Sequence, residues 1–143
     1  MDQEILQMFS DEIRAIEKEL KVVIFGLIKS KLRDKSLFEK YGQIIDRVYG
    51  TAATLNFMEV ADYCRMMKEI TYKCSASDNE VGIQKCMYLM LESLKYLEII
   101  PKTVSDAEEL KKIRYKMKLD LGRGENLTRS YFFSIKKTSV DRG

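Results

Sequence analysis

The sequence predicts an all-α protein. Apolar residues recur at spacings of three and four along most of the chain, the pattern of helices with one buried face. One proline and seven glycines among 143 residues leave few points at which a helix must stop. Hydrophobic residues make up 45% and charged residues 33% of the chain, as expected for one globular domain with its own core.

Five helical segments are expected in chain order. In the first, Ser10 followed by Asp11 and Glu12 is a potential cap that predicts a break between a short leading helix and a longer one. The second is expected to start at Ser36, which is a good N-cap residue. The expected segments are 2–32, 36–55, 57–74, 77–100 and 105–121.

Capping and turn residues define the ends of these segments. Ser77 with Glu80, and Ser105 with Glu108, have the spacing of capping boxes, in which side chains satisfy the first free amides of a helix. Asparagine, proline and glycine are the residues that stop helices. The expected stops are Asn56, Pro101, Gly122 and Gly124.

Four long amphipathic segments joined by short turns predict an antiparallel up-down four-helix bundle, with the fifth segment as an additional helix. We expect residues 1–122 to form this domain and residues 123–143 to be a C-terminal tail or linker. The tail holds a short aromatic, β-prone run, 131–135, between basic residues. This run could fold back, pair with a second chain to make a homodimer, or begin a following linker.

Composition excludes several functional classes. The chain has no histidine, which rules out phosphohistidine, a histidine general base and Ser-His or Cys-His catalysis. Three cysteines without metal-ligand spacing predict free thiols, a cytoplasmic location and no metal or other cofactor. The most apolar run, Val22–Ile28, is far shorter than the roughly 20 residues that span a bilayer, so we expect a buried helix face and no membrane partner.

One flank of the second helix stands out from the rest. At about 100° per residue its core stripe centres on Ile45, Val48 and Ala52. Two glycines inside a helix cost about 1 kcal/mol each relative to alanine. They are either substitutions that the fold tolerates without a function, or they leave room on this surface for the backbone or a bulky side chain of a partner to approach closely. The flank beside the stripe consists of Gly42, Gln43, Asp46, Tyr49, Gly50 and Ala53, and we take it as a candidate partner-binding site.

The same helix resembles the core motif of histidine-containing phosphotransfer (Hpt) domains. That motif runs histidine, two residues, lysine, glycine, a small residue and alanine, and then a turn. The opening run 8–12 resembles the start of the family. The positions that match the motif are Gly50, Thr51, Ala52, Ala53, Leu55 and the turn at Asn56-Phe57. Asp46 stands in place of the phosphoaccepting histidine, and Tyr49 in place of the neighbouring lysine.

The resemblance, which covers roughly residues 1–122, implies a degenerate Hpt domain in two-component signalling. Such a domain would still dock a response-regulator receiver domain or a kinase, but Asp46 could not replace the imidazole as a phosphate carrier. Receiver-type phosphoaspartate needs a metal ion held by further carboxylates, which the helical neighbours of Asp46 do not supply.

Three other classes compete with this interpretation. A structural or oligomerising helical bundle would need no phosphorelay partner. Nucleic-acid binding is disfavoured, because the basic residues of the last helix spread around its axis and are diluted by acidic ones, as on a solvated face. An enzyme is not expected, since no phosphate-binding glycine loop or nucleophile elbow is present. The basic residues concerned are Lys111, Lys112, Arg114, Lys116 and Lys118.

Overall fold

The structure, a computed structural model, describes residues 2–132 and is helical throughout this range apart from short turns. The all-α prediction is confirmed for these residues, which contain no strand. The helices are α1 (Gln3–Lys29), α2 (Ser36–Ile45), α3 (Arg47–Thr54), α4 (Met58–Ser75), α5 (Glu80–Thr103), α6 (Ala107–Leu119), α7 (Leu121–Leu127) and the π-helical turn η1 (Thr128–Phe132).

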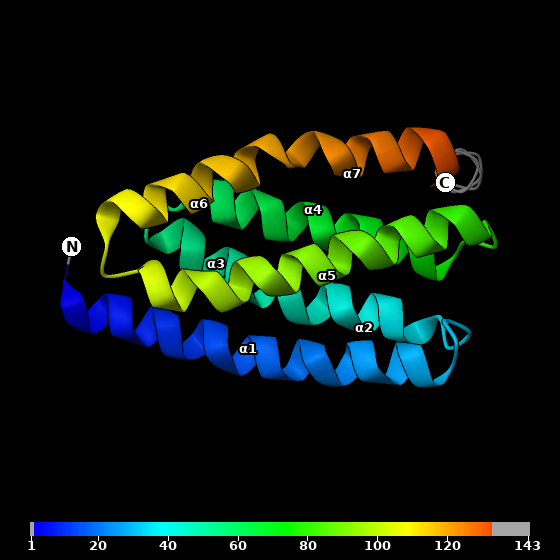
Figure 1. The fold of residues 1–143 in the computed structure, drawn as a ribbon, viewed down its shortest axis with the longest axis horizontal. Coiled ribbons are helices and arrows are strands. Elements are labelled where there is room, and N and C mark those ends of the chain that lie inside the picture. Colours follow the sequence, from blue (N-terminus) through cyan, green and yellow to red (C-terminus); the bar gives the residue numbers. More distant parts are fainter. Residues whose placement is uncertain (1, 133–143) are drawn as a thin grey trace.

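The helices lie side by side along one long axis (Figure 1). Helix α1 packs against α2 and α5, α2 and α3 pack against α4, and α6 and α7 cover α4 on the side away from α1. Tyr41 is fully buried in the middle of the core. Its hydroxyl pairs with the Met90 carbonyl at 2.9 Å and with Ser93 Oγ at 2.5 Å, so the largest polar group of the core is satisfied.

Helix α1 is a single unbroken helix, so the predicted break at Ser10 is wrong. Ser10 is buried in the same stripe as Leu6, Phe9 and Ile13 and therefore lies on the core face instead of capping a second helix. The real cap is Asp2, whose carboxylate accepts the Glu4 amide at 2.8 Å. A serine is small enough to be tolerated inside a helix when apolar neighbours bury the same face.

The apolar run at the end of α1 is only half buried, which corrects the expectation of a buried face. Its core side packs inward through Val23, Ile24 and Leu27. Val22, Phe25 and Ile28 are instead 73%, 64% and 60% exposed. Among residues 2–132, no helix combines the length and the apolar character needed to cross a membrane.

The second predicted helix is divided at Asp46 into α2 and α3, although Asp46 keeps helical dihedral angles. Ser36 is the first helical residue of α2, and Lys35 occupies the cap position, but its side chain makes no capping hydrogen bond to α2. The turn predicted at Asn56 is confirmed. Asn56 has φ of 62°, and the Phe57 amide donates to the Ala52 carbonyl at 2.8 Å, which closes the end of α3.

Both predicted capping boxes and the predicted stop at Pro101 are wrong. Asn79 caps α5 by accepting the Gly82 amide, and Asp106 caps α6 by accepting the amides of residues 108 and 109. In both cases a residue closer to the helix takes the place of the predicted serine, Ser77 or Ser105. Pro101 lies buried inside the last turn of α5, which continues to Thr103. A proline there removes one amide donor, but α5 ends two residues later.

The segment predicted as a tail begins as helix and packs onto the body. Gly122 and Gly124 lie within α7 and do not end it. At Gly124 the backbone lies against α4, where a Cβ atom would come 2.6 Å from Met66 Cγ. At Gly82 of α5 a Cβ would come 2.8 Å from Tyr131 Cβ. Part of the predicted aromatic run, 133–135, lies outside the described residues.

Phe132 anchors this segment, so we expect its removal to destabilise the whole domain. Its ring is fully buried against α5. Phe132→Ala should lower the free energy of unfolding by about 3–5 kcal/mol, as for other buried aromatic truncations. Urea denaturation measures this, with Tyr115→Ala as the control, because Tyr115 is exposed on α6 and its change should stay within about 0.5 kcal/mol. Equal effects of the two substitutions on the free energy of unfolding would contradict the packing of Phe132 against α5.

Candidate functional site

The six residues of the predicted flank lie on α2, on α3 and at the junction between them. The structure places them in three classes of exposure. Gln43 and Gly50 are exposed, Asp46, Tyr49 and Ala53 are half-buried, and Gly42 is buried.

Gly42 serves internal packing and is not part of an open surface, which corrects its place in the predicted site. It lies against α4, where a Cβ would overlap Thr71 Oγ1 and come 3.1 Å from the Tyr72 ring. Thr71 cannot easily move aside, because it is buried and its hydroxyl donates to the Met67 carbonyl at 2.8 Å. The glycine therefore lets the backbones of α2 and α4 approach closely.

Gly50 has the opposite environment. It is exposed on α3, and no atom of another element lies within 4 Å of the position its Cβ would take. Of the six glycines in the described residues, only Gly50 and Gly122 have this open surrounding. No packing contact therefore requires a glycine at position 50.

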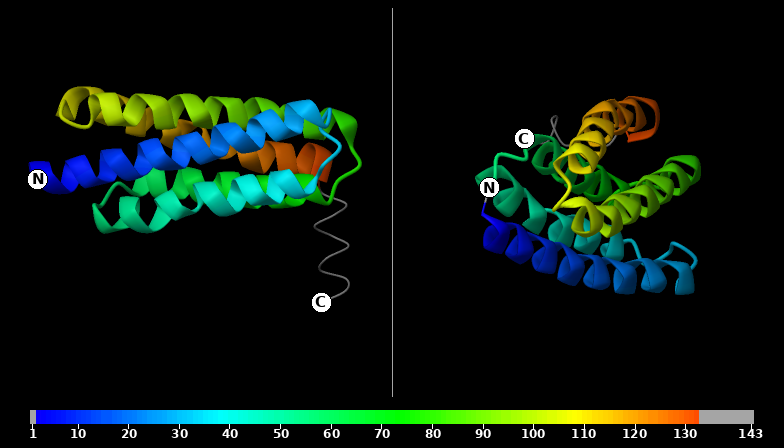
Figure 2. Two further views of the ribbon diagram at one scale, coloured as in Figure 1. Left: turned by 90° about the horizontal axis from the view of Figure 1, so that it is seen from below. Right: turned by 60° about the vertical axis from the view of Figure 1, so that its left-hand side comes forward.

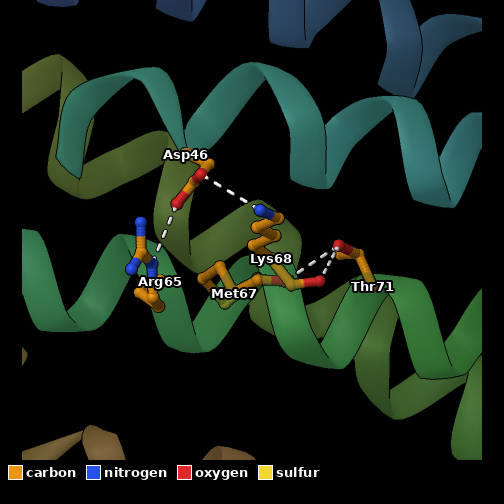
Figure 3. Close-up of polar contacts among 5 residues, drawn as sticks. All are labelled: Asp46, Arg65, Met67, Lys68 and Thr71. Atoms are coloured by element: carbon orange, nitrogen blue, oxygen red, sulfur yellow. Dashed lines mark hydrogen bonds and ion pairs between the residues drawn. The ribbon is translucent and has the colours of Figure 1, made fainter. Parts of the chain in front are cut away.

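Asp46 lies between two cations of α4 (Figure 3). Its two carboxylate oxygens accept from Arg65 Nε at 3.3 Å and from Lys68 Nζ at 3.2 Å. The Asp46 side chain is 20% exposed, and those of Arg65 and Lys68 are more so. The cluster therefore lies at the surface, with two cations against one carboxylate.

Tyr49 joins the same cluster through its ring. The Arg65 guanidinium carbon lies 3.6 Å from the centre of the Tyr49 ring, a cation–π contact. Arg65 is thus held by a carboxylate and by an aromatic face at once. Ala53 packs against the core one turn further along α3. We call Asp46, Tyr49, Arg65 and Lys68 the Asp46 cluster.

The opposite edge of α3 is attached to α1. Thr51 Oγ1 donates to the Glu12 carboxylate at 2.9 Å, and Arg47 pairs with Glu19 at 2.8 Å. Helix α3 is therefore fixed on one side by α1 and on the other by the Asp46 cluster. Between these two fixed edges, Gly50 faces outward with no side chain.

Sequence reasoning missed Arg65 and Lys68, which lie 19 and 22 residues after Asp46. One signal could have indicated them. They are spaced by three on the third predicted helix, so they share a face just beside its core residues Cys64 and Met67. Only the pairing of α2 and α3 with α4 shows that this basic face meets Asp46.

The thiol nearest to the cluster is shielded. Burial raises the pKa of the Cys64 thiol far above its ordinary value, and the neighbouring Asp46 carboxylate raises it further. Cys64 is thus held as a neutral thiol and is not an activated nucleophile. Among residues 2–132, no three cysteine, aspartate or glutamate side chains gather as a group that could hold a metal ion.

Comparison of the chain with protein-family models, with curated proteins and with solved structures returns no match.

The two glycines of the flank should respond oppositely to alanine. Gly42→Ala should lower the free energy of unfolding by about 1–3 kcal/mol, because the added methyl group forces α2 away from α4. Gly50→Ala should raise it by about 0.4–1 kcal/mol, because the site is open and alanine restricts the unfolded chain. Urea titration of both variants provides the measurement. A destabilising Gly50→Ala would show that the surface around Gly50 is packed after all.

The Asp46 cluster should contribute little to stability. Asp46→Asn removes two ion pairs whose cations remain hydrated at the surface, so the loss should be below about 1 kcal/mol. The loss should shrink further in high salt, which screens exposed pairs. Thermal unfolding at low and high ionic strength tests this. A loss of several kcal/mol would identify Asp46 as a structural residue.

Proposed function

We propose that this chain is a non-catalytic, Hpt-like protein-binding domain. It docks the receiver domain of a response regulator, or a kinase domain, in two-component signalling without accepting a phosphoryl group. The binding surface is the flank around Gly50, with Gln43, Asp46, Tyr49 and Ala53, and it extends to Arg65 and Lys68. Gly42 supports this surface from within.

The observation that carries the proposal is the open surrounding of Gly50. An exposed helical glycine costs stability, and here no internal contact explains it. A partner that presses a side chain or a backbone onto α3 does explain it, because any side chain at position 50 would stand in its way. Tyr49 lies beside Gly50 and offers an aromatic side chain of the kind that often contributes most of the binding energy at an interface.

The charges of the flank suit a receiver domain. Two cations outnumber the single carboxylate in the Asp46 cluster. Receiver domains gather carboxylates around their phosphoaspartate and its metal ion, so their active face is acidic. A weakly positive flank would favour encounter with such a face and orient it.

The same cluster argues against phosphotransfer. A carboxylate lacks the imidazole nitrogen that accepts phosphate in the family, and Asp46 is already engaged by two cations from its own chain. Competition with an active phosphotransfer domain for one receiver would make this protein a brake or an insulator in the pathway. It would act in the cytoplasm, where three unpaired thiols remain reduced.

The proposal includes an antiparallel up-down four-helix core like that of the family. In this assignment α1, α2 with α3, α4 and α5 form the core, and α6 with α7 is the additional element. In Figure 1 the chain reverses between α1 and α2, between α3 and α4, between α4 and α5, and between α5 and α6, and this course supports the assignment.

A bulky residue at position 50 should abolish docking. Gly50→Arg fills the low point of the flank and has open space into which to extend, so the fold should persist. Calorimetric titration against a panel of receiver domains from the same genome should show binding by the unaltered chain and none by the variant. Circular dichroism of both proteins checks that the variant is folded.

The matched control is Gly122→Arg, because Gly122 has an equally open surrounding but lies on α7. It should bind as the unaltered chain does. Incubation with a phosphorylated receiver that binds should leave the chain unlabelled. Unchanged affinity of Gly50→Arg, or stable transfer of phosphate to the chain, would overturn the proposal.

A second candidate function is a structural or oligomerising helical module. The exposed apolar residues of α1 favour self-association through that helix, whereas the sequence suggested the C-terminal run.

A further inference from the structure

The outer face of α1 carries a row of exposed apolar residues. Met8, Val22 and Phe25 are 67%, 73% and 64% exposed, and Ala15 is exposed between them. Met8, Ala15 and Val22 follow one another at intervals of seven residues, with Phe25 three further on. Met8, Ala15 and Val22 thus occupy successive a positions of a heptad repeat and Phe25 a d position, while the two preceding d positions hold the charged residues Asp11 and Lys18.

No described element covers this row. The neighbours of α1 are α2, α3 and α5, and all of them lie on its core side. Figure 1 shows α1 along the lower edge of the molecule. In the left view of Figure 2, which is seen from below, α1 lies in front of the other helices, and in the right view it lies below them. Single exposed apolar residues are common in monomers, but an aligned row on an unpaired helix marks a contact surface.

The charges along this row are divided between its two halves. The N-terminal half carries Glu4 and Asp11, and the C-terminal half carries Lys18 and Lys29, all of them exposed. Asp11 lies 3.6 Å from Arg14, but both groups are well exposed, so this pair is weak. A second α1 in antiparallel orientation would set acidic half against basic half, whereas a parallel one would set like charges together.

We propose that two copies of this chain associate through the outer faces of their α1 helices, antiparallel about a two-fold axis between residues 16 and 17. This register places Glu4 opposite Lys29 of the second copy and Met8 opposite Phe25. Asp11 then lies one helical turn from Lys18 of the second copy. Ala15, near the axis, allows the two helices to approach closely.

The proposed contact is one of modest extent. Helix α1 has 27 residues and is therefore about 40 Å long, and only one of its faces takes part. Such an interface belongs with small, reversible contacts rather than with obligate dimers. It goes beyond the proposed function, because it uses neither Gly50 nor the Asp46 cluster and leaves both flanks of the dimer open.

Sedimentation equilibrium of the full chain over a range of concentrations tests the association. The apparent mass should rise from 16.7 kDa toward twice that value as the concentration increases. Phe25→Glu should hold it at the monomer value, because the carboxylate would face Met8 of the second copy. Tyr115→Glu, a similar change of an exposed aromatic on α6, should leave the dimer unchanged. A chain that stays monomeric at every concentration would overturn the proposal.

Charge exchange and cross-linking test the orientation. Asp11→Lys and Lys18→Asp should each weaken the dimer, and the double variant should restore it. Ala15→Cys should be joined to its counterpart by a short bis-maleimide reagent, since the three native thiols are buried. Glu4→Cys should not be joined, because antiparallel packing separates the two sites by roughly 37 Å at 1.5 Å per residue. Preferential cross-linking at position 4 would refute the antiparallel arrangement.

A last variant distinguishes this surface from the C-terminal run. Phe133→Ser with Ile135→Ser in the full chain should leave the dimer intact. A dimer that survives Phe25→Glu but is lost with these two changes would overturn the proposal and locate self-association in the C-terminal run. None of these variants alters the flank, so receiver binding can be measured on each and can fail or succeed independently.

Discussion

The close approach of α2 to α4 at Gly42 sets the distance across which the candidate site is built. Because no side chain separates the helices at that point, α2 rests directly on Thr71 and Tyr72 of α4. One turn further along the chain, at the junction of α2 and α3, Asp46 then comes within reach of Arg65 and Lys68. A larger residue at position 42 would move the carboxylate away from both cations and Tyr49 away from Arg65. The surface chemistry therefore depends on a buried glycine that never meets a partner.

The helices could be predicted from the sequence more reliably than the residues at which they end. The helices were predictable because spacing of apolar residues reports directly on burial, and the turn at Asn56 because asparagine tolerates the left-handed conformation. The breaks at Ser10 and Gly124 were predicted wrongly, since a local preference for caps and turns is weaker than the packing of an apolar face around it. Pro101 is a further example, because α5 continues past it in spite of the local preference of proline for ending a helix.

The candidate site was predictable in position but not in composition. The flank of α2 and α3 was found because glycine is unusual inside a helix. The two glycines nevertheless differ in their surroundings, since Gly42 packs against α4 and Gly50 has no internal contact that requires a glycine. That difference lies in contacts between residues some 30 positions apart, which no local pattern encodes. Arg65 and Lys68 were missed for the same reason. Their meeting with Asp46 turns an apparently isolated surface carboxylate into the centre of a small, cation-rich cluster.

The three cysteines give the fold a built-in reporter of its own opening. Cys64 and Cys74 lie on α4 and Cys86 on α5, and all three are buried. Burial raises the pKa of Cys86 as it does that of Cys64, so neither thiol yields appreciable thiolate while the helices stay together. Oxidants and alkylating reagents can then reach them only when the packed core around them opens. The rate of thiol modification thus measures how often the core opens transiently.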